Sequence, residues 1–93
     1  MNNTVTQERI NKILLKTEFS TQTVFGKCTV VTAKLPNGFV ITESSACVDV
    51  DNYDRQLGFE ICKRKIINKI WELEGYKLQQ KIYKKNKKKR RLV

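Results

Sequence analysis

The C-terminal segment most constrains how this chain can fold, because a run of like charges repels itself and stays in solvent. The last thirteen residues hold eight of the nineteen Lys and Arg side chains and no acid. The other eighty residues are nearly balanced, with eleven bases against nine acids, a net charge of about +2. We therefore predict a single small domain over residues 1–80 and a basic tail over residues 81–93 that is disordered when free.

Two helices are predicted, one before and one after a pair of strands. Residues 4–16 have apolar side chains at helical spacing. Residues 51–74 predict a longer helix, with Asp51 as its N-cap and Gly75 as the residue that ends it. Its apolar stripe has helical steps of three and four residues and consists of Phe59, Cys62, Ile66, Ile70 and Leu73.

A β-hairpin is predicted over residues 21–48, where β-branched and aromatic residues are frequent. Asn37-Gly38 lies between the two strands, and this pair tolerates the positive φ that a tight turn requires. Gly26 is interpreted as a bulge or bend within the first strand. The fold class is therefore α+β: an N-terminal helix, a β-hairpin, a long second helix and a flexible basic C-terminal tail.

The second helix has another apolar set on roughly its opposite side, formed by Tyr53, Leu57, Ile67 and Trp71. A helix that is apolar on two sides is either central to a fold or packed against another subunit. One side can cover the hairpin, and the other can cover the first helix or a second copy of the chain. A homodimer through the second helix stays open, with Leu57 and Trp71 as candidate interface residues.

The residues that enzymes most often use are scarce. The chain has no histidine, which removes the commonest general base and metal ligand, and its four glycines are scattered rather than gathered in a phosphate loop. The cysteines Cys28, Cys47 and Cys62 are widely separated, which favours buried reduced thiols over a metal site. We expect no enzymatic activity, no metal and no cofactor.

Neither a membrane span nor a signal peptide is visible. No stretch approaches the ~20 apolar residues that a transmembrane helix needs. The N-terminus lacks the basic start and apolar run of a secretory signal. We therefore expect a cytoplasmic protein that has no membrane partner.

Several distinctive blocks follow one another between Leu35 and Leu78: Asn37-Gly38-Phe39, Ser45-Ala46-Cys47-Val48-Asp49, Tyr53-Asp54, Gly58 and Trp71-Glu72-Leu73-Glu74-Gly75-Tyr76. In this order they resemble a family of small tailed-phage proteins, the gp-forty-nine-like phage family. The resemblance implies a phage or prophage origin, but it assigns no general activity. The lysine tail lies outside this pattern.

The first hypothesis for function is an anti-defence protein, for example an anti-CRISPR. It would bind a host nucleoprotein defence complex and inhibit it by stoichiometric occlusion, with the basic tail in a groove meant for nucleic acid. The second is direct, non-specific DNA or RNA binding in phage replication or transcription, because lysines that neutralise phosphates release counterions. A weaker third hypothesis is sequestration of an anionic nucleotide signal at an oligomer interface.

The candidate contacts with nucleic acid or an acidic partner are mostly in the tail. Tyr83 could stack on an unpaired base, and bases on the second helix could extend the surface. The candidates are Tyr83, Lys84, Lys85, Lys87, Lys88, Lys89, Arg90 and Arg91, with Lys63, Arg64 and Lys69 as secondary contacts.

Overall fold

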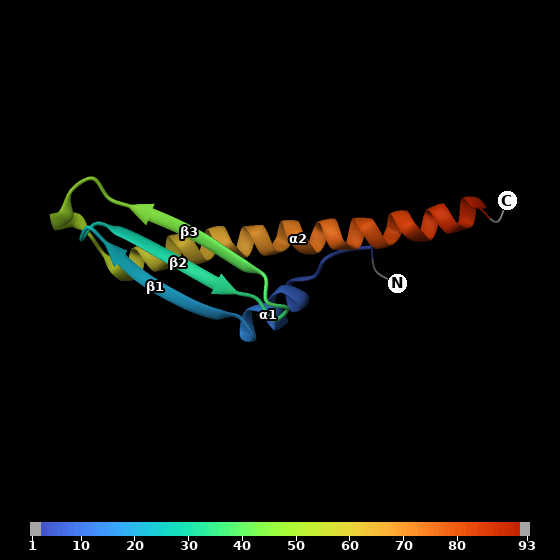
Figure 1. Cartoon of the computed structure of the whole chain (residues 1–93), viewed down its shortest axis with the longest axis horizontal. Coiled ribbons are helices and arrows are strands. Elements are labelled where there is room, and N and C mark those ends of the chain that lie inside the picture. The colour runs from blue at the N-terminus through green and yellow to red at the C-terminus, as the bar shows by residue number, and fades with distance from the viewer. Residues whose placement is uncertain (1–2, 92–93) are drawn as a thin grey trace.

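The molecule consists of a three-stranded antiparallel sheet, a short helix at one end of it and one very long helix (Figure 1). The computed structural model describes residues 3–91, and it describes the side chains only as far as residue 88. The elements are α1 (Gln7–Leu15), β1 (Glu18–Val24), β2 (Cys28–Lys34), β3 (Val40–Ala46), a 3₁₀ turn η1 (Val50–Asn52) and α2 (Arg55–Arg91). The predicted α+β class is confirmed.

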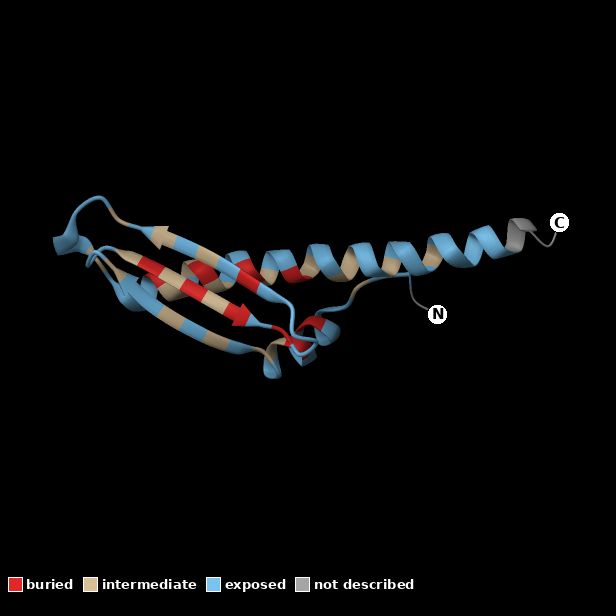
Figure 2. Cartoon of the chain, viewed as in Figure 1, coloured by how far each residue is buried: buried red, intermediate tan, exposed pale blue. Residues whose placement is uncertain are grey.

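The core lies between α2 and one face of the sheet. Alternate residues of the central strand, Thr29, Val31 and Ala33, are fully buried, since side chains of a strand alternate between its two faces. α2 meets them with the predicted stripe of Cys62, Ile66 and Ile70, all buried. α1 adds Ile10 and Ile13 at the end of the sheet. Figure 2 shows that the buried positions end where α2 leaves the sheet.

The predicted hairpin is confirmed at its turn but is incomplete. Gly38 adopts a φ of 94° between β2 and β3, and its N–H donates to the Leu35 carbonyl at 2.9 Å. The first predicted strand, however, is two strands joined by a second turn at Phe25-Gly26. Both of these residues have positive φ, 54° and 67°. Gly26 therefore marks a chain reversal rather than a bulge. The sequence did not indicate this turn, because a bulky residue such as Phe25 rarely adopts positive φ.

α2 begins at Arg55, and its N-cap lies three residues after the predicted one. Asp49 caps the 3₁₀ turn, where its Oδ1 accepts a hydrogen bond from the Asp51 N–H at 3.0 Å. Asp54 then takes the capping role for α2, because its Oδ1 accepts from the Leu57 N–H at 3.1 Å. The assignment of Asp51 as the N-cap was wrong. The segment contains three aspartates, and any of them could cap a helix. Which of them lies close to a free backbone N–H depends on the course of the backbone, which the sequence does not show.

Gly58 and Tyr53 fix the crossing of α2 over the sheet. A Cβ at Gly58 would overlap the Thr29 hydroxyl and lie 2.8 Å from the Thr29 Cβ, so the helix can approach this closely only with glycine. The buried Thr29 hydroxyl is 2.8 Å from the Tyr53 hydroxyl, which lies 2.9 Å from that of Thr23. Gly58 thus permits the close crossing of α2 over the central strand.

The long helix does not end at Gly75. α2 continues for sixteen residues beyond it, from Tyr76 to Arg91, so the predicted boundary was wrong. Gly75 does not have positive φ, and its neighbours Glu, Leu, Lys and Gln are strong helix formers. The disorder predicted for the free tail stays a prediction. No helix of the described part of the chain is long and apolar enough to cross a membrane.

Candidate nucleic-acid interface

A line of lysines follows one side of α2 beyond the sheet. Up to Ile70 this side is apolar and packs on the strands. Steps of four and three residues from Ile70 then lead to Glu74, Lys77, Lys81, Lys84 and Lys88. Residues at this spacing share one helix face. The side that packs on the sheet therefore becomes basic where the helix leaves the sheet, and the four lysines span about 16 Å of the helix axis.

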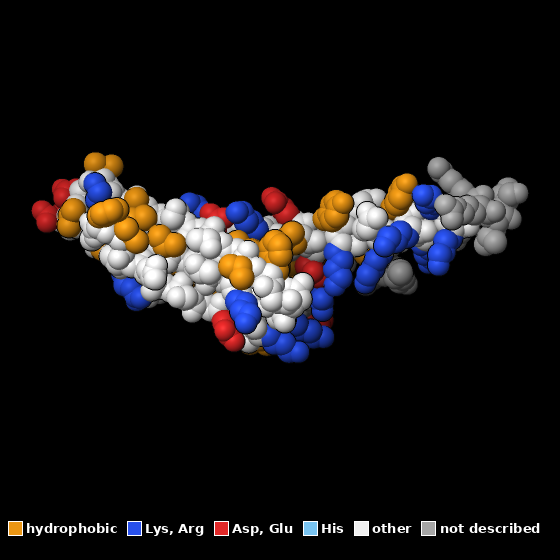
Figure 3. Space-filling view, viewed as in Figure 1, with side chains coloured by type: hydrophobic (Ala, Val, Ile, Leu, Met, Phe, Trp, Pro, Cys, Tyr) orange, Lys and Arg blue, Asp and Glu red, His pale blue; other side chains and the backbone are white. Residues whose placement is uncertain are grey.

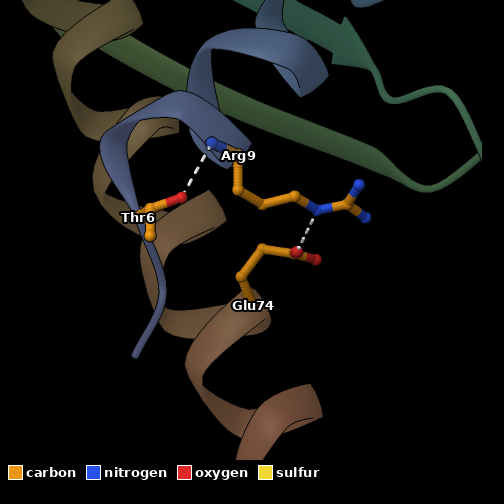
Figure 4. Close-up of polar contacts among 3 residues, drawn as sticks. All are labelled: Thr6, Arg9 and Glu74. Carbon is orange, nitrogen blue, oxygen red and sulfur yellow. Dashed lines mark hydrogen bonds and ion pairs between the residues drawn. The ribbon is translucent and has the colours of Figure 1, made fainter. Parts of the chain in front are cut away.

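A shallow groove lies at the start of this lysine line, where the N-terminal segment meets α2. It has a volume of about 290 Å³ and is lined by Thr4, Val5, Thr6, Arg9, Glu74, Lys77, Leu78 and Lys81. Arg9 and Glu74 form an ion pair across it, with Arg9 Nε 2.9 Å from Glu74 Oε1 (Figure 4). Thr6 caps α1 by accepting from the Arg9 N–H at 3.1 Å, which holds the backbone of Arg9 in place.

The ion pair leaves Arg9 able to contact an anion as well. Figure 4 shows that its two terminal nitrogens point away from Glu74. The side chain of Arg9 is half exposed, whereas that of Glu74 is only 18% exposed. A guanidinium that is held by one carboxylate through Nε can still donate two hydrogen bonds to a phosphate. Arg9 therefore extends the lysine line onto α1.

The ionisable side chains of α2 beyond Glu74 with a full charge at neutral pH are all positive. No acid follows Glu74 in the sequence. The bases with described side chains after it are Lys77, Lys81, Lys84, Lys85, Lys87 and Lys88, all exposed. Figure 3 shows blue side chains gathered under the projecting helix and around α1. We call Arg9 together with these six lysines the basic surface.

The structure brings most of the predicted tail contacts onto one helix. Lys84, Lys85, Lys87 and Lys88 are exposed on the projecting part of α2, and Tyr83 lies among them with 55% of its surface exposed. The side chains of Lys89, Arg90 and Arg91 lie outside the described residues. Because a helix spreads successive residues around its axis, Lys85 and Lys87 flank the lysine line rather than joining it.

The three secondary contacts are not part of the basic surface. Lys69 Nζ lies 2.6 Å from Glu43 Oε2, and that carboxylate is 15% exposed, so the lysine is bound to the sheet. Lys63 lies 6.0 Å from the centroid of the Phe19 ring. Arg64 is exposed, but a helical step of 100° per residue puts it well away from the lysine line.

The two predicted interface residues differ in their surroundings. Trp71 is half-buried and packs against the core, which gives it a structural role within one chain. Leu57 is 58% exposed near the start of α2, as an intermolecular contact would require.

Sequence reasoning missed Arg9 and Lys77. The signal for Lys77 was present, since Lys77, Lys81, Lys84 and Lys88 have helical spacing, but the predicted break at Gly75 concealed it. No comparable signal exists for Arg9, which is 65 residues away from its partner Glu74. Only the packing of α1 on α2 brings the two together.

The described residues offer little for metal or thiol chemistry. They contain no group of three or more His, Cys, Asp or Glu side chains that could hold a metal ion. Burial raises the pKa of the Cys62 thiol, and nearby Glu43 and Cys28 act in the same direction against Lys65. Cys62 therefore stays protonated near neutral pH, in the form that is a poor nucleophile.

Comparison with known proteins gives one match. Residues 5–82 match the model of a family described as "Phage protein (N4 Gp49/phage Sf6 gene 66) family", so the match includes α1, the sheet and α2 as far as about two turns beyond Gly75. No curated protein and no solved structure matches the chain. Lys77 and Lys81 lie within the matched range, and the other four lysines of the basic surface follow it.

Proposed function

Since the chain belongs to the phage protein (N4 Gp49/phage Sf6 gene 66) family, we propose that this phage protein binds DNA or RNA directly through the basic surface, without reading sequence. The observation that carries the proposal is the lysine line, in which four lysines of one helix face project beyond the domain. An α-helix fits the major groove of duplex DNA, and lysines act as point charges on phosphates. The role proposed is that of a non-enzymatic accessory protein in the infected host cell.

The charges also bear on the anti-defence hypothesis, in which the tail occupies a nucleic-acid groove of a host complex. Such a groove is itself basic, so an approaching basic helix meets like charge unless the groove already contains guide RNA or DNA. The projecting shape favours this candidate, because the helix can reach into a groove while the domain stays outside. We therefore keep occlusion of a loaded nucleoprotein complex as the second candidate function.

A charge-matched pair of triple variants tests direct binding. The first replaces Lys81, Lys84 and Lys88 with Gln, and the second replaces Lys27, Lys34 and Arg64 with Gln. Each lowers the net charge from +10 by three, to +7. Affinity for duplex DNA, single-stranded DNA and RNA is measured by fluorescence anisotropy over a range of salt concentrations.

We expect the first variant to weaken binding and to make the salt slope shallower by about 2 to 3, because each lost phosphate contact removes about 0.7 to 0.9 from it. The second variant should keep the slope of the unmodified protein. If both variants weaken binding equally, the affinity depends on the net charge of the protein and not on the position of the lysines. If the unmodified chain binds none of the three nucleic acids at physiological salt, direct binding is wrong, and binding to purified guide-loaded effector complexes becomes the test.

A further inference from the structure

Two of the three tyrosines lie on the projecting part of α2, beyond the sheet. The third, Tyr53, has a structural role, since its hydroxyl lies within hydrogen-bond distance of both Thr23 and Thr29. The other two are Tyr76 and Tyr83, whose side chains are 72% and 55% exposed. Burial in the domain therefore does not account for these two rings.

Tyr76 and Tyr83 lie on the same side of the helix, and we call them the tyrosine pair. They are seven residues apart, which is close to two full turns, so they are separated by about 10 Å along the helix axis. Steps of three and four residues add Leu73, Gln80 and Lys87 to this row. No acid occurs between the two tyrosines or after them in the sequence. This side of the helix is therefore aromatic and free of negative charge from Tyr76 onward.

The tyrosine pair and the lysine line lie on neighbouring sides of one helix. At 100° per residue the two sides are about a third of a turn apart, and Lys87 lies between them. Figure 3 shows exposed hydrophobic side chains along the projecting helix, with lysines gathered beneath them. A polymer that follows this helix can thus place negative groups on one side and flat apolar groups on the other.

We propose that the projecting helix binds single-stranded nucleic acid, with phosphates on the lysine line and unpaired bases stacked on Tyr76 and Tyr83. This inference rests on the proposed function and narrows its ligand to strands with unpaired bases. Proteins that bind single strands without reading sequence combine a basic track for the backbone with aromatic side chains for the bases. In a duplex the bases are stacked on one another inside the helix, so the tyrosine pair meets no free base there.

Replacement of both Tyr76 and Tyr83 by Ala tests the inference, because it removes the two rings and leaves the net charge at +10. Fluorescence anisotropy of the full-length protein measures its affinity for oligothymidylate, oligouridylate and a DNA duplex of equal length. We expect the single strands to bind at least about tenfold more weakly, since one stacked base contributes about fivefold or more. The affinity for the duplex and the salt slope should stay unchanged, because the phosphate contacts remain. A loss confined to oligothymidylate assigns DNA as the ligand, a loss confined to oligouridylate assigns RNA, and either supports the inference.

Two control variants separate base stacking from other effects. Replacement of both tyrosines by Phe keeps the rings and should keep the affinity for single strands. Phe25→Gly removes another ring, which is 90% exposed at the turn between β1 and β2, and should leave every affinity unchanged. Glycine also tolerates the positive φ of this position. Alanine is a better helix former than tyrosine, so a loss of binding in the alanine variant does not come from a weaker helix.

An alanine variant that keeps its affinity for both single strands overturns the inference. So does a variant that loses affinity for the duplex to the same degree, because the rings would then act on something other than unpaired bases. The proposed function survives either result if replacement of Lys81, Lys84 and Lys88 still weakens binding, so the two conclusions fail separately. If the unmodified chain binds no nucleic acid at physiological salt, both are wrong.

Discussion

Gly58 and Gly75 are both within α2, yet their surroundings differ completely. Gly58 faces Thr29 so closely that a Cβ would overlap it, whereas a Cβ at Gly75 would meet nothing within 4 Å. The same replacement by alanine therefore has opposite consequences at the two sites. Sequence reasoning placed the end of the helix at Gly75, but the helix continues through this residue.

Gly58→Ala should lower the free energy of unfolding by about 1–3 kcal/mol, because the overpacking at Thr29 exceeds the gain in helix propensity. Gly75→Ala should raise stability, by up to about 1 kcal/mol, because alanine is the better helix former. Urea unfolding of both variants beside the unmodified protein measures the two effects. A loss of stability in Gly75→Ala would contradict a continuous helix and restore the break that the sequence predicted.

Repulsion between lysines destabilises the helical conformation of the projecting part of α2. Lys77–Lys81, Lys81–Lys85 and Lys84–Lys88 are like-charged pairs four residues apart, each unfavourable by about 0.2–0.5 kcal/mol. Strong helix formers and a favourable interaction of cations with the C-terminal end of the helix dipole act in the other direction. These opposing contributions are similar in size, so salt or a bound polyanion can change how much of this segment is helical.

We expect the helical signal in far-ultraviolet circular dichroism to rise with salt and to rise further on adding polyphosphate or an oligonucleotide. Screening weakens the repulsion between lysines, and bound phosphates neutralise it. Residues 1–80 alone should show little change, which makes this truncated chain the control. If the full-length signal stays constant, the helix is already complete in the free protein, and binding orders nothing further.

At the scale of the whole molecule, the fold and the basic surface are separable. The buried core ends at Ile70, while the molecule extends over 66 Å along its longest axis. Removal of residues 81–93 deletes eight positive charges and leaves a net charge of +2. Neither the core nor the Arg9–Glu74 ion pair is touched by this removal.

The 1–80 chain should therefore unfold cooperatively, with a free energy within about 1 kcal/mol of the full-length value, because changes in exposed surface rarely cost more. Reduced self-repulsion acts in its favour. Calorimetry or urea unfolding measures this directly. An unfolded or aggregated 1–80 chain would show that the projecting helix supports the domain, and would contradict the predicted boundary at residue 80.

Features that depend on near neighbours in the chain could be predicted from the sequence. Helical spacing indicated the buried stripe through Cys62, Ile66 and Ile70, the Asn37-Gly38 pair indicated a turn, and the segregated charges indicated the basic tail. Three features became visible only in the folded chain: the reversal at Phe25, the pairing of Arg9 with Glu74 and the passage of α2 through Gly75. Local spacing and composition reveal which residues share a face, whereas contacts between distant residues exist only once the elements have packed.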